Sequence, residues 1–144
     1  MCTLDRRAVF VDAVQAMSAC EELLRTSADY QFEIIAYCLM PDHLHVLLNG
    51  LADDADFRRF VSMYKQRTGF RYRKRTTACL WQEGYFEHVL RADEDIVGVA
   101  AYVVANPIRA GLCGSPTEYP YLSSPAYSLE SLIDAVQIRP GSRP

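Results

Sequence analysis

The sequence predicts an α+β domain in which helices cover one face of an antiparallel sheet. Two observations lead to this fold class. Three stretches carry apolar residues at helical spacing, and three short runs have the composition of strands, in the order helix, strand, strand, helix, strand, helix. One more strand ahead of the first helix would make this order approximate the ferredoxin-like pattern. The length of 144 residues suits one domain with its own hydrophobic core.

The first predicted helix and strand follow a short polar stretch. Residues 1–10 are too short and too polar to form a strand by themselves. Asp12 is a suitable N-cap for a helix to about residue 27, whose apolar residues recur at helical spacing: Val14, Met17, Cys20, Leu23 and Leu24. Residues 32–40 are almost continuously apolar, which predicts a buried strand.

Two histidines follow the turn after this strand. Pro41 and Asp42 supply the turn, because proline fixes φ and the aspartate can bond its downstream backbone. We therefore interpret Asp42 as a turn former rather than a metal ligand. The second strand extends from His43 to Leu48, and alternation places His43 and His45 on the same face. Two imidazoles that share a face can bind a metal ion, although such pairs are more often structural.

The sequence pattern in the second half of the chain predicts two further long helices and a third strand. Residues 55–75 form a helix with an apolar stripe and many cations, and Tyr85–Arg91 alternates as a strand does. The next helix begins at an Asp93 cap and weakens before Pro107, because proline disfavours helical geometry at the preceding residue. A short helix is predicted at residues 129–136 in the C-terminal part.

Composition indicates a cytoplasmic protein without a membrane segment. No apolar run approaches the roughly 18 residues of a membrane span, and the first five residues do not resemble a signal peptide. The five cysteines are widely spaced and include no CxxC pair. This pattern argues against a disulfide framework and against a zinc–cysteine site.

Positive charge is concentrated in one block. Residues 57–82 contain no acid, whereas the rest of the chain has seven cations and eighteen acids. A basic block on an otherwise acidic protein indicates a surface for a polyanion, and the alternative interpretation is a solvated helix face. The cations that could contact such a polyanion are Arg58, Arg59, Lys65, Arg67, Arg71, Arg73, Lys74 and Arg75.

A second polar pair lies near the end of the last long helix. Tyr102 and Asn106 are four residues apart, so a helix directs the hydroxyl and the amide to the same side. Spacing alone favours a simpler interpretation, in which Tyr102 is a core residue and Asn106 caps the helix.

Three motifs taken in order indicate a family. The segments MPDHLHVLL, WQEGYFEHVLR and YVVANPIRAGL together resemble those of the REP-associated tyrosine transposases, which are single-tyrosine, IS200-like transposases of the HUH endonuclease superfamily. The resemblance extends from about residue 3 to residue 125. It implies an IS200-like domain of ferredoxin-like fold at residues 1–125 and a C-terminal tail at 126–144.

This resemblance implies a role for each candidate residue. Tyr102 corresponds to the nucleophile that attacks single-stranded DNA and forms a 5′-phosphotyrosine intermediate. His43, His45 and Asn106 correspond to the ligands of a divalent metal, Mg²⁺ or Mn²⁺. The basic block would follow the DNA backbone of a hairpin, and Tyr64, Phe70 or Tyr72 would stack on bases. The active form would be a monomer or a homodimer.

One feature departs from the family pattern. Only residues 1–3 remain of the strand that relatives carry ahead of the first helix. We therefore expect the first strand to be truncated, and we expect the DNA just upstream to encode an in-frame strand segment. The alternative to a transposase is a truncated or domesticated DNA-binding module without catalytic activity. A third possibility is an unrelated metal hydrolase that uses the two histidines.

Overall fold

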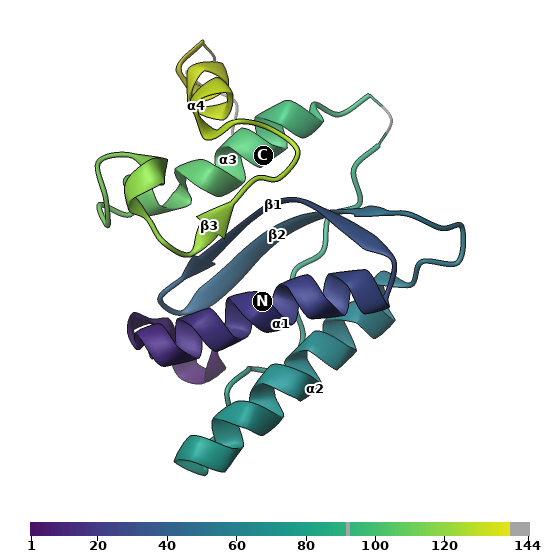
Figure 1. The fold of residues 1–144 in the computed structure, drawn as a ribbon, viewed down its shortest axis with the longest axis vertical. Helices are drawn as coiled ribbons and strands as arrows, with labels where there is room; N and C mark the ends of the chain where they lie inside the picture. The colour runs from purple at the N-terminus through teal and green to yellow at the C-terminus, as the bar shows by residue number, and fades with distance from the viewer. Residues whose placement is uncertain (92, 139–144) are drawn as a thin grey trace.

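The computed structural model describes residues 1–91 and 93–138 and has an α+β fold built on a three-stranded antiparallel sheet. The strand order is β2-β1-β3, so β1 (Phe32–Met40) lies between β2 (His43–Gly50) and the short β3 (Leu122–Ser123). Figure 1 shows α1 and α2 below the sheet and α3 and α4 above it. The helices are α1 (Ala13–Asp29), α2 (Phe57–Thr76), α3 (Ile96–Arg109) and α4 (Leu129–Ile138), with short 3-10 helices at Leu4–Arg6, Val9–Val11 and Pro116–Glu118.

The α+β class and the antiparallel sheet are confirmed, but helices cover both faces of the sheet rather than one. The reason lies in β1, whose side chains are apolar on both sides. Tyr37 and Leu39 join the core next to α1 and α2, whereas Ala36, Cys38 and Met40 join the core next to α3 and α4. A strand that is apolar on both faces must be covered on both faces.

The third strand predicted at Tyr85–Arg91 is wrong. In the part of the chain that the structure describes, these residues have no strand pairing, and Phe86 and Val89 are 88% and 75% exposed. The second edge of β1 instead pairs with Leu122 and Ser123. An alternating pattern determines which residues share a face, but a strand also needs a partner edge with free backbone groups, and the pattern does not identify that edge.

α1 begins where predicted, but a different face of it is buried. Asp12 caps the helix by accepting hydrogen bonds from two backbone N–H groups of the first turn. Three residues of the predicted stripe are more than half exposed, namely Val14, Met17 and Leu24. The buried face carries Ala16, Ala19 and Leu23 together with Glu22.

α3 continues past Pro107 to its end at Arg109, so the predicted weakening of this helix is wrong. Proline has no N–H, and the carbonyl of Val103, four residues earlier, therefore lacks its usual helical partner. The Asn106 amide donates a hydrogen bond to this carbonyl at 3.2 Å and another to the Tyr102 carbonyl at 2.9 Å. A side chain thus replaces the backbone donor that proline removes.

The two later long helices start slightly further along the chain than predicted. Asp56 caps α2 by accepting from two backbone N–H groups, and Asp95 occupies the N-cap position of α3. The predicted C-terminal helix is confirmed as α4, whose Leu132 is fully buried in the core that α3 shares. The last part of the predicted tail, residues 139–144, lies outside the described residues. None of the described helices is long and apolar enough to cross a membrane.

The first residues of the chain lie along the outer edge of β2. Cys2 forms a single β-bridge with His43, and Thr3 forms another with Trp81. These isolated bridges agree with the expectation that residues 1–10 do not form a strand. They also place residues 2 and 3 between the strand that carries the histidines and the segment around Trp81.

Candidate active site and nucleic-acid interface

The two histidines of the predicted metal site converge on one face of β2. Across the β1–β2 ladder, His43 is paired with Met40 and His45 with Cys38, so all four side chains face α3. Leu44, which lies between the histidines, points the other way into the core next to α1 and α2. The Nε2 atoms of His43 and His45 are 2.9 Å apart, and the rings meet edge to face.

Asp42 fixes the orientation of the His43 ring. Its Oδ1 lies 2.5 Å from His43 Nδ1, and its Oδ2 forms an ion pair with Arg6 Nε at 3.1 Å. An ionised carboxylate only accepts hydrogen bonds, so Nδ1 donates to Asp42 and Nε2 is the ring nitrogen that points toward His45. Asp42 is therefore a positioning residue as well as the predicted turn former. The sequence signal for this role was its place directly before His43.

His45 is neutral at physiological pH. Burial is the main cause that lowers the pKa of His45 to about 4, together with electrostatic effects of His43, the chain start and Arg6, against a smaller opposing effect of Asp42. A neutral imidazole offers a ring-nitrogen lone pair, which is the form that binds a metal ion.

α3 brings Tyr102 to the histidine pair. Ala100, Ala101 and Val104 are buried in the core against β1, and this packing lays α3 across the face that carries the histidines. The ring centroids of Tyr102 and His45 are 6.4 Å apart, with an interplanar angle of 86°. The structure therefore brings His43, His45 and Tyr102 together in one place.

Arg109 is a site residue that the sequence analysis missed. Its guanidinium carbon lies 4.7 Å from the centroid of the Tyr102 ring. The two residues are seven positions apart, which is close to two helical turns and puts them on one face of α3. That spacing was the signal available in the sequence. The planar cation places positive charge beside the phenol, where a phosphate could bind.

Asn106 lies one helical turn after Tyr102. Its amide nitrogen donates to two carbonyls of its own helix, so Oδ1 is the atom left for an outside partner. Among the described contacts, no hydrogen bond joins Asn106 to either histidine. The structure thus places Asn106 on the same helix as Tyr102, one turn further along, without joining it to the histidine pair.

The spacing of the two histidine nitrogens suits a divalent metal ion. Two nitrogens at adjacent positions of an octahedral ion would lie about 3 Å apart, and the two Nε2 atoms are 2.9 Å apart. Within residues 1–91 and 93–138, no group of three or more His, Cys, Asp and Glu side chains could hold a metal. A metal here would therefore need an oxygen donor of another kind beside the histidines, and the Asn106 amide is the candidate.

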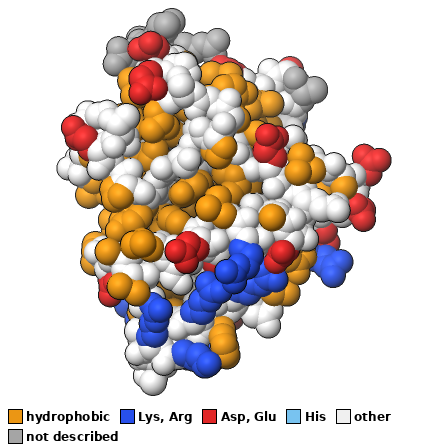
Figure 2. All heavy atoms as spheres, viewed as in Figure 1, with side chains coloured by type: hydrophobic (Ala, Val, Ile, Leu, Met, Phe, Trp, Pro, Cys, Tyr) orange, Lys and Arg blue, Asp and Glu red, His pale blue; other side chains and the backbone are white. Residues whose placement is uncertain are grey.

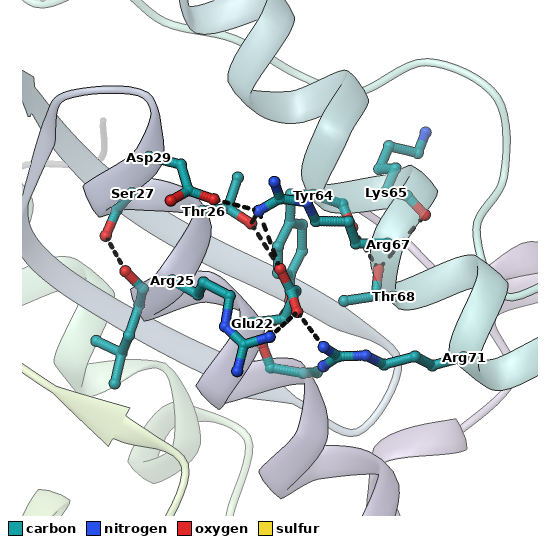
Figure 3. A network of polar contacts seen from close by, with 12 residues as sticks. Glu22, Arg25, Thr26, Ser27, Asp29, Tyr64, Lys65, Arg67, Thr68 and Arg71 are labelled. Carbon is teal, nitrogen blue, oxygen red and sulfur yellow. Dashed lines mark hydrogen bonds and ion pairs between the residues drawn. The ribbon is translucent and has the colours of Figure 1, made fainter.

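Two cations of the basic block hold α1 against α2. Glu22 of α1 is 1% exposed, and its carboxylate pairs with Arg67 at 3.3 Å and with Arg71 at 2.7 Å. Arg67 also pairs with Asp29 at 2.7 Å, and Arg25 approaches Glu22 from α1 itself. Figure 3 shows these arginines surrounding the Glu22 carboxylate between the two helices. Arg67 and Arg71 therefore have a structural role in the fold.

Two further cations hold the segment that follows α2. Lys65 Nζ donates to the carbonyl oxygens of Gln82 and Gly84 at 2.6 and 3.0 Å. Arg73 Nη2 lies 3.1 Å from Cys79 Sγ. These contacts fix the loop against the helix while leaving part of each side chain at the surface.

The remaining cations of the block face solvent. Arg58, Arg59 and Arg75 are exposed and make no side-chain hydrogen bond or ion pair in the part of the chain that the structure describes. Lys74 is exposed too, and its Nζ lies 5.1 Å from the centroid of the Phe70 ring. Figure 2 shows Lys and Arg side chains gathered at the lower end of the molecule, over α1 and α2.

Only one of the three aromatic candidates for base stacking is accessible. Tyr64 is fully buried and Tyr72 is 9% exposed, whereas Phe70 is 61% exposed. Tyr64 and Tyr72 therefore belong to the core, and Phe70 is the ring that a base can reach.

Comparison with known proteins identifies the family. The sequence model of the family described as "Transposase IS200 like" matches residues 1–106, and the chain belongs to this family. Within it, the relatives found are REP-associated tyrosine transposases. A Haemophilus influenzae protein described in these terms is 27% identical over 69% of this chain and 62% of its own length. The REP-associated tyrosine transposase of Escherichia coli K12 is 27% identical over 69% of this chain and 58% of its own length.

A solved structure has the same fold. It is described as a REP-associated tyrosine transposase bound to a REP hairpin, and it matches with a TM-score of 0.70 at 21% identity, covering 84% of this chain and 71% of that chain. The predicted family and fold class are therefore confirmed. The chain spans about three fifths of the length of the curated relatives it matches.

Proposed function

We propose that this chain is a divalent-metal-dependent enzyme that cuts and rejoins single-stranded DNA at hairpins, with Tyr102 as the nucleophile. The observation that carries the proposal is the position of Tyr102, whose ring lies 6.4 Å from that of His45, beside two converging imidazole nitrogens. Membership of a transposase family, with relatives named tyrosine transposases, supports it.

In the proposed reaction, the Tyr102 hydroxyl oxygen attacks a DNA phosphorus and forms a 5′-phosphotyrosine. The bond from phosphorus to the 3′-oxygen breaks, and this oxygen gains a proton as the phenol loses one. One phosphoester bond forms as another breaks, so the bond energy is retained and the reverse step can join a new 3′ end. Hydrolysis, by contrast, transfers the phosphate to water and does not retain this bond energy for rejoining.

The other residues of the site orient and neutralise charged groups. A metal ion held by His43, His45 and Asn106 would draw charge from a phosphate oxygen, which helps a weak nucleophile to attack. Asp42 keeps His43 Nε2 turned toward the site, and burial keeps His45 unprotonated. Arg109 adds fixed positive charge beside the Tyr102 ring.

The proposed substrate is hairpin DNA. We propose the cytoplasm as the place where the protein acts on it. The exposed cations of α2 supply charge for phosphate contacts at Arg58, Arg59, Lys74 and Arg75. The solved relative, described as bound to a REP hairpin, supports a hairpin rather than a plain single strand. Because one chain contributes both the histidines and the tyrosine, the site supports action as a monomer.

A labelled DNA hairpin with single-stranded flanks tests the proposal. With Mn²⁺ or Mg²⁺, we expect nicked DNA and a protein–DNA adduct that survives denaturing electrophoresis. Tyr102→Phe should abolish both, because it removes only the attacking oxygen. Tyr30→Phe, which changes a half-buried tyrosine at the end of α1, is the matched control and should leave the adduct unchanged.

Other outcomes of this assay point to different functions. Tight hairpin binding without an adduct would indicate a DNA-binding module that lacks catalysis. Metal-dependent cleavage that persists in Tyr102→Phe would indicate a hydrolase in which water, rather than the tyrosine, attacks the phosphate.

A further inference from the structure

A groove of about 470 Å³ lies between α2 and the segment that follows it. Its apolar surface comes from Phe70, Leu80 and Trp81, and Lys65 and Arg73 contribute positive charge. Among the described residues that line it there is no carboxylate. Its volume falls within the roughly 300–1,000 Å³ that is usual for ligand sites.

Hydrogen bonds on both sides keep the walls of this groove in place. Trp81 Nε1 donates to Thr68 Oγ1 at 2.8 Å, which fixes the indole against α2. Lys65 ties the backbone just after Trp81 to α2 through the carbonyls of Gln82 and Gly84. Leu80 is 4% exposed and forms a buried floor. The groove is therefore a fixed feature of the fold.

Gly69 keeps part of the groove open. It lies in the interior of α2, where glycine is unfavourable by roughly 0.5–1 kcal/mol relative to alanine. Packing does not require a glycine here, because a Cβ at this position would meet only Trp81 Cδ1 at 3.9 Å, an ordinary van der Waals contact. A side chain at this position would, however, cover the edge of the indole ring that lines the groove.

The surroundings of the groove are complementary to a nucleotide. Phe70 is 61% exposed, and the ammonium of Lys74 lies 5.1 Å from the centre of its ring. An accessible aromatic ring among cations suits a flat base joined to an anionic backbone.

The groove lies near the outer edge of the strand that carries the histidines. Trp81 bridges to Thr3, and the neighbouring Cys2 bridges to His43, so two strand spacings separate Trp81 from His43. Two strand spacings amount to roughly 10 Å. The histidines face α3 and the groove adjoins α2, so a DNA strand held at both would pass around this edge of the sheet.

We infer that the groove binds one unpaired nucleobase of the DNA substrate, with Phe70 and Trp81 stacking on the base and Arg73 and Lys74 contacting the adjoining phosphates. This inference rests on the proposed function and extends it, because it assigns a separate binding position to a nucleotide away from the scissile phosphate.

The single tryptophan of the chain makes the groove observable, because all tryptophan fluorescence comes from Trp81. The probes are a DNA hairpin with unpaired thymidines in its flanks, the same hairpin with abasic sites at those positions, and the blunt paired stem. We expect the first probe to quench Trp81 and the other two to bind more weakly without quenching. Equal quenching by the hairpin and its abasic form would overturn the inference.

Two variants test the groove independently of fluorescence. Phe70→Ala should weaken hairpin binding roughly five- to hundredfold, as loss of one base-stacking ring does. Phe86→Ala removes an even more exposed phenylalanine outside the groove and should leave the affinity unchanged. Gly69→Leu should also weaken binding while raising, or not lowering, the thermal midpoint, since leucine favours helix and has room.

Failure of this inference can be distinguished from failure of the proposed function. Adduct formation with wild-type affinity in both Phe70→Ala and Gly69→Leu would refute the groove while leaving Tyr102 as the nucleophile. Loss of quenching and affinity in these variants, with adduct still formed at saturating DNA, would support the groove. Absence of any hairpin binding by the wild-type protein would refute both.

Discussion

Asp42 determines which nitrogen of His43 is available to the site, because its carboxylate accepts from Nδ1. Asp42→Asn should weaken Mn²⁺ binding roughly ten- to hundredfold, as loss of a carboxylate behind a histidine ligand commonly does. Isothermal titration of the DNA-free protein with Mn²⁺ measures the change. Asp53→Asn, an exposed aspartate in the loop after β2, is the control. Equal Mn²⁺ affinity in the wild type and Asp42→Asn would contradict this role.

Arg109 should act on the reaction more than on DNA binding. Its guanidinium carbon lies over the Tyr102 ring, 4.7 Å from the centroid, so in the proposed reaction its charge would lie beside the attacked phosphate. We expect Arg109→Ala to slow adduct formation roughly ten- to hundredfold and to change hairpin affinity little. Single-turnover rates at saturating DNA measure this, with Arg91→Ala as an exposed control.

Arg109→Lys separates charge from geometry in the same assay. Lysine keeps the charge but lacks the planar fork, so it should restore only part of the rate. A rate for Arg109→Ala equal to the wild type would show that the stacking on Tyr102 is structural.

At the scale of single residues, the sequence could place together those side chains that lie a few positions apart on one strand or helix. His43 and His45 share a face because strands alternate, and helical spacing puts Tyr102 and Asn106 on one side, although only the family resemblance selected them as site residues. The functions of Asp42 and Arg109 depend on the ring that lies next to each of them. Each lies close to its ring in the sequence, but spacing alone does not specify the side-chain conformations that make the contact.

Among the elements, α1 and α2 are joined by a buried ion-pair cluster around Glu22. Glu22→Gln would leave Arg67 and Arg71 without their shared partner, and these arginines are only 32% and 38% exposed. Breaking a buried pair lowers the free energy of unfolding by roughly 3–5 kcal/mol. We expect about 2–3 kcal/mol here, because water reaches the arginines and screens them. Urea denaturation followed by circular dichroism measures the loss.

Asp29→Asn is the matched control for this cluster. Asp29 pairs with the same Arg67, but its side chain is 47% exposed. Its loss should lower the free energy of unfolding by less than about 1 kcal/mol, as for surface pairs. Equal losses in Glu22→Gln and Asp29→Asn would show that burial of Glu22 does not determine the strength of the cluster.

The elements were predictable where the pattern was long and local. The apolar run of β1, the Asp12 cap and the cationic helix α2 all formed as the sequence indicated. β3 has only two residues, too few for a period to appear. Glu22 faces the core because arginines thirty or more positions away neutralise it, so no amphipathic pattern of α1 alone could place it there.

At the scale of the whole molecule, the sheet lies between the candidate active site and the basic helix α2. The histidines and Tyr102 lie on the face that α3 covers, whereas the basic helix α2 lies on the opposite face (Figure 1). A DNA molecule that contacts both has to pass around the sheet, and one such path follows residues 1–3 and Trp81 beyond the outer edge of β2. This geometry explains why a base-binding groove at that edge would help to hold the substrate.

The same geometry predicts that the eight cations of α2 do not contribute equally to DNA binding. Each phosphate contact steepens the dependence of log affinity on log salt concentration by roughly 0.7–0.9. Arg75→Gln removes an exposed, unpaired charge, so it should reduce this slope by about one contact and leave the free energy of unfolding unchanged.

Arg71→Gln removes a charge that Glu22 already neutralises. It should lower the free energy of unfolding and leave the salt slope as in the wild type. Hairpin titrations at several salt concentrations, together with urea denaturation of each variant, measure both quantities. If Arg71→Gln reduced the slope as much as Arg75→Gln, then DNA would have to draw Arg71 away from Glu22. Binding would in that case loosen the contact between α1 and α2, which increased protease sensitivity of the DNA complex would reveal.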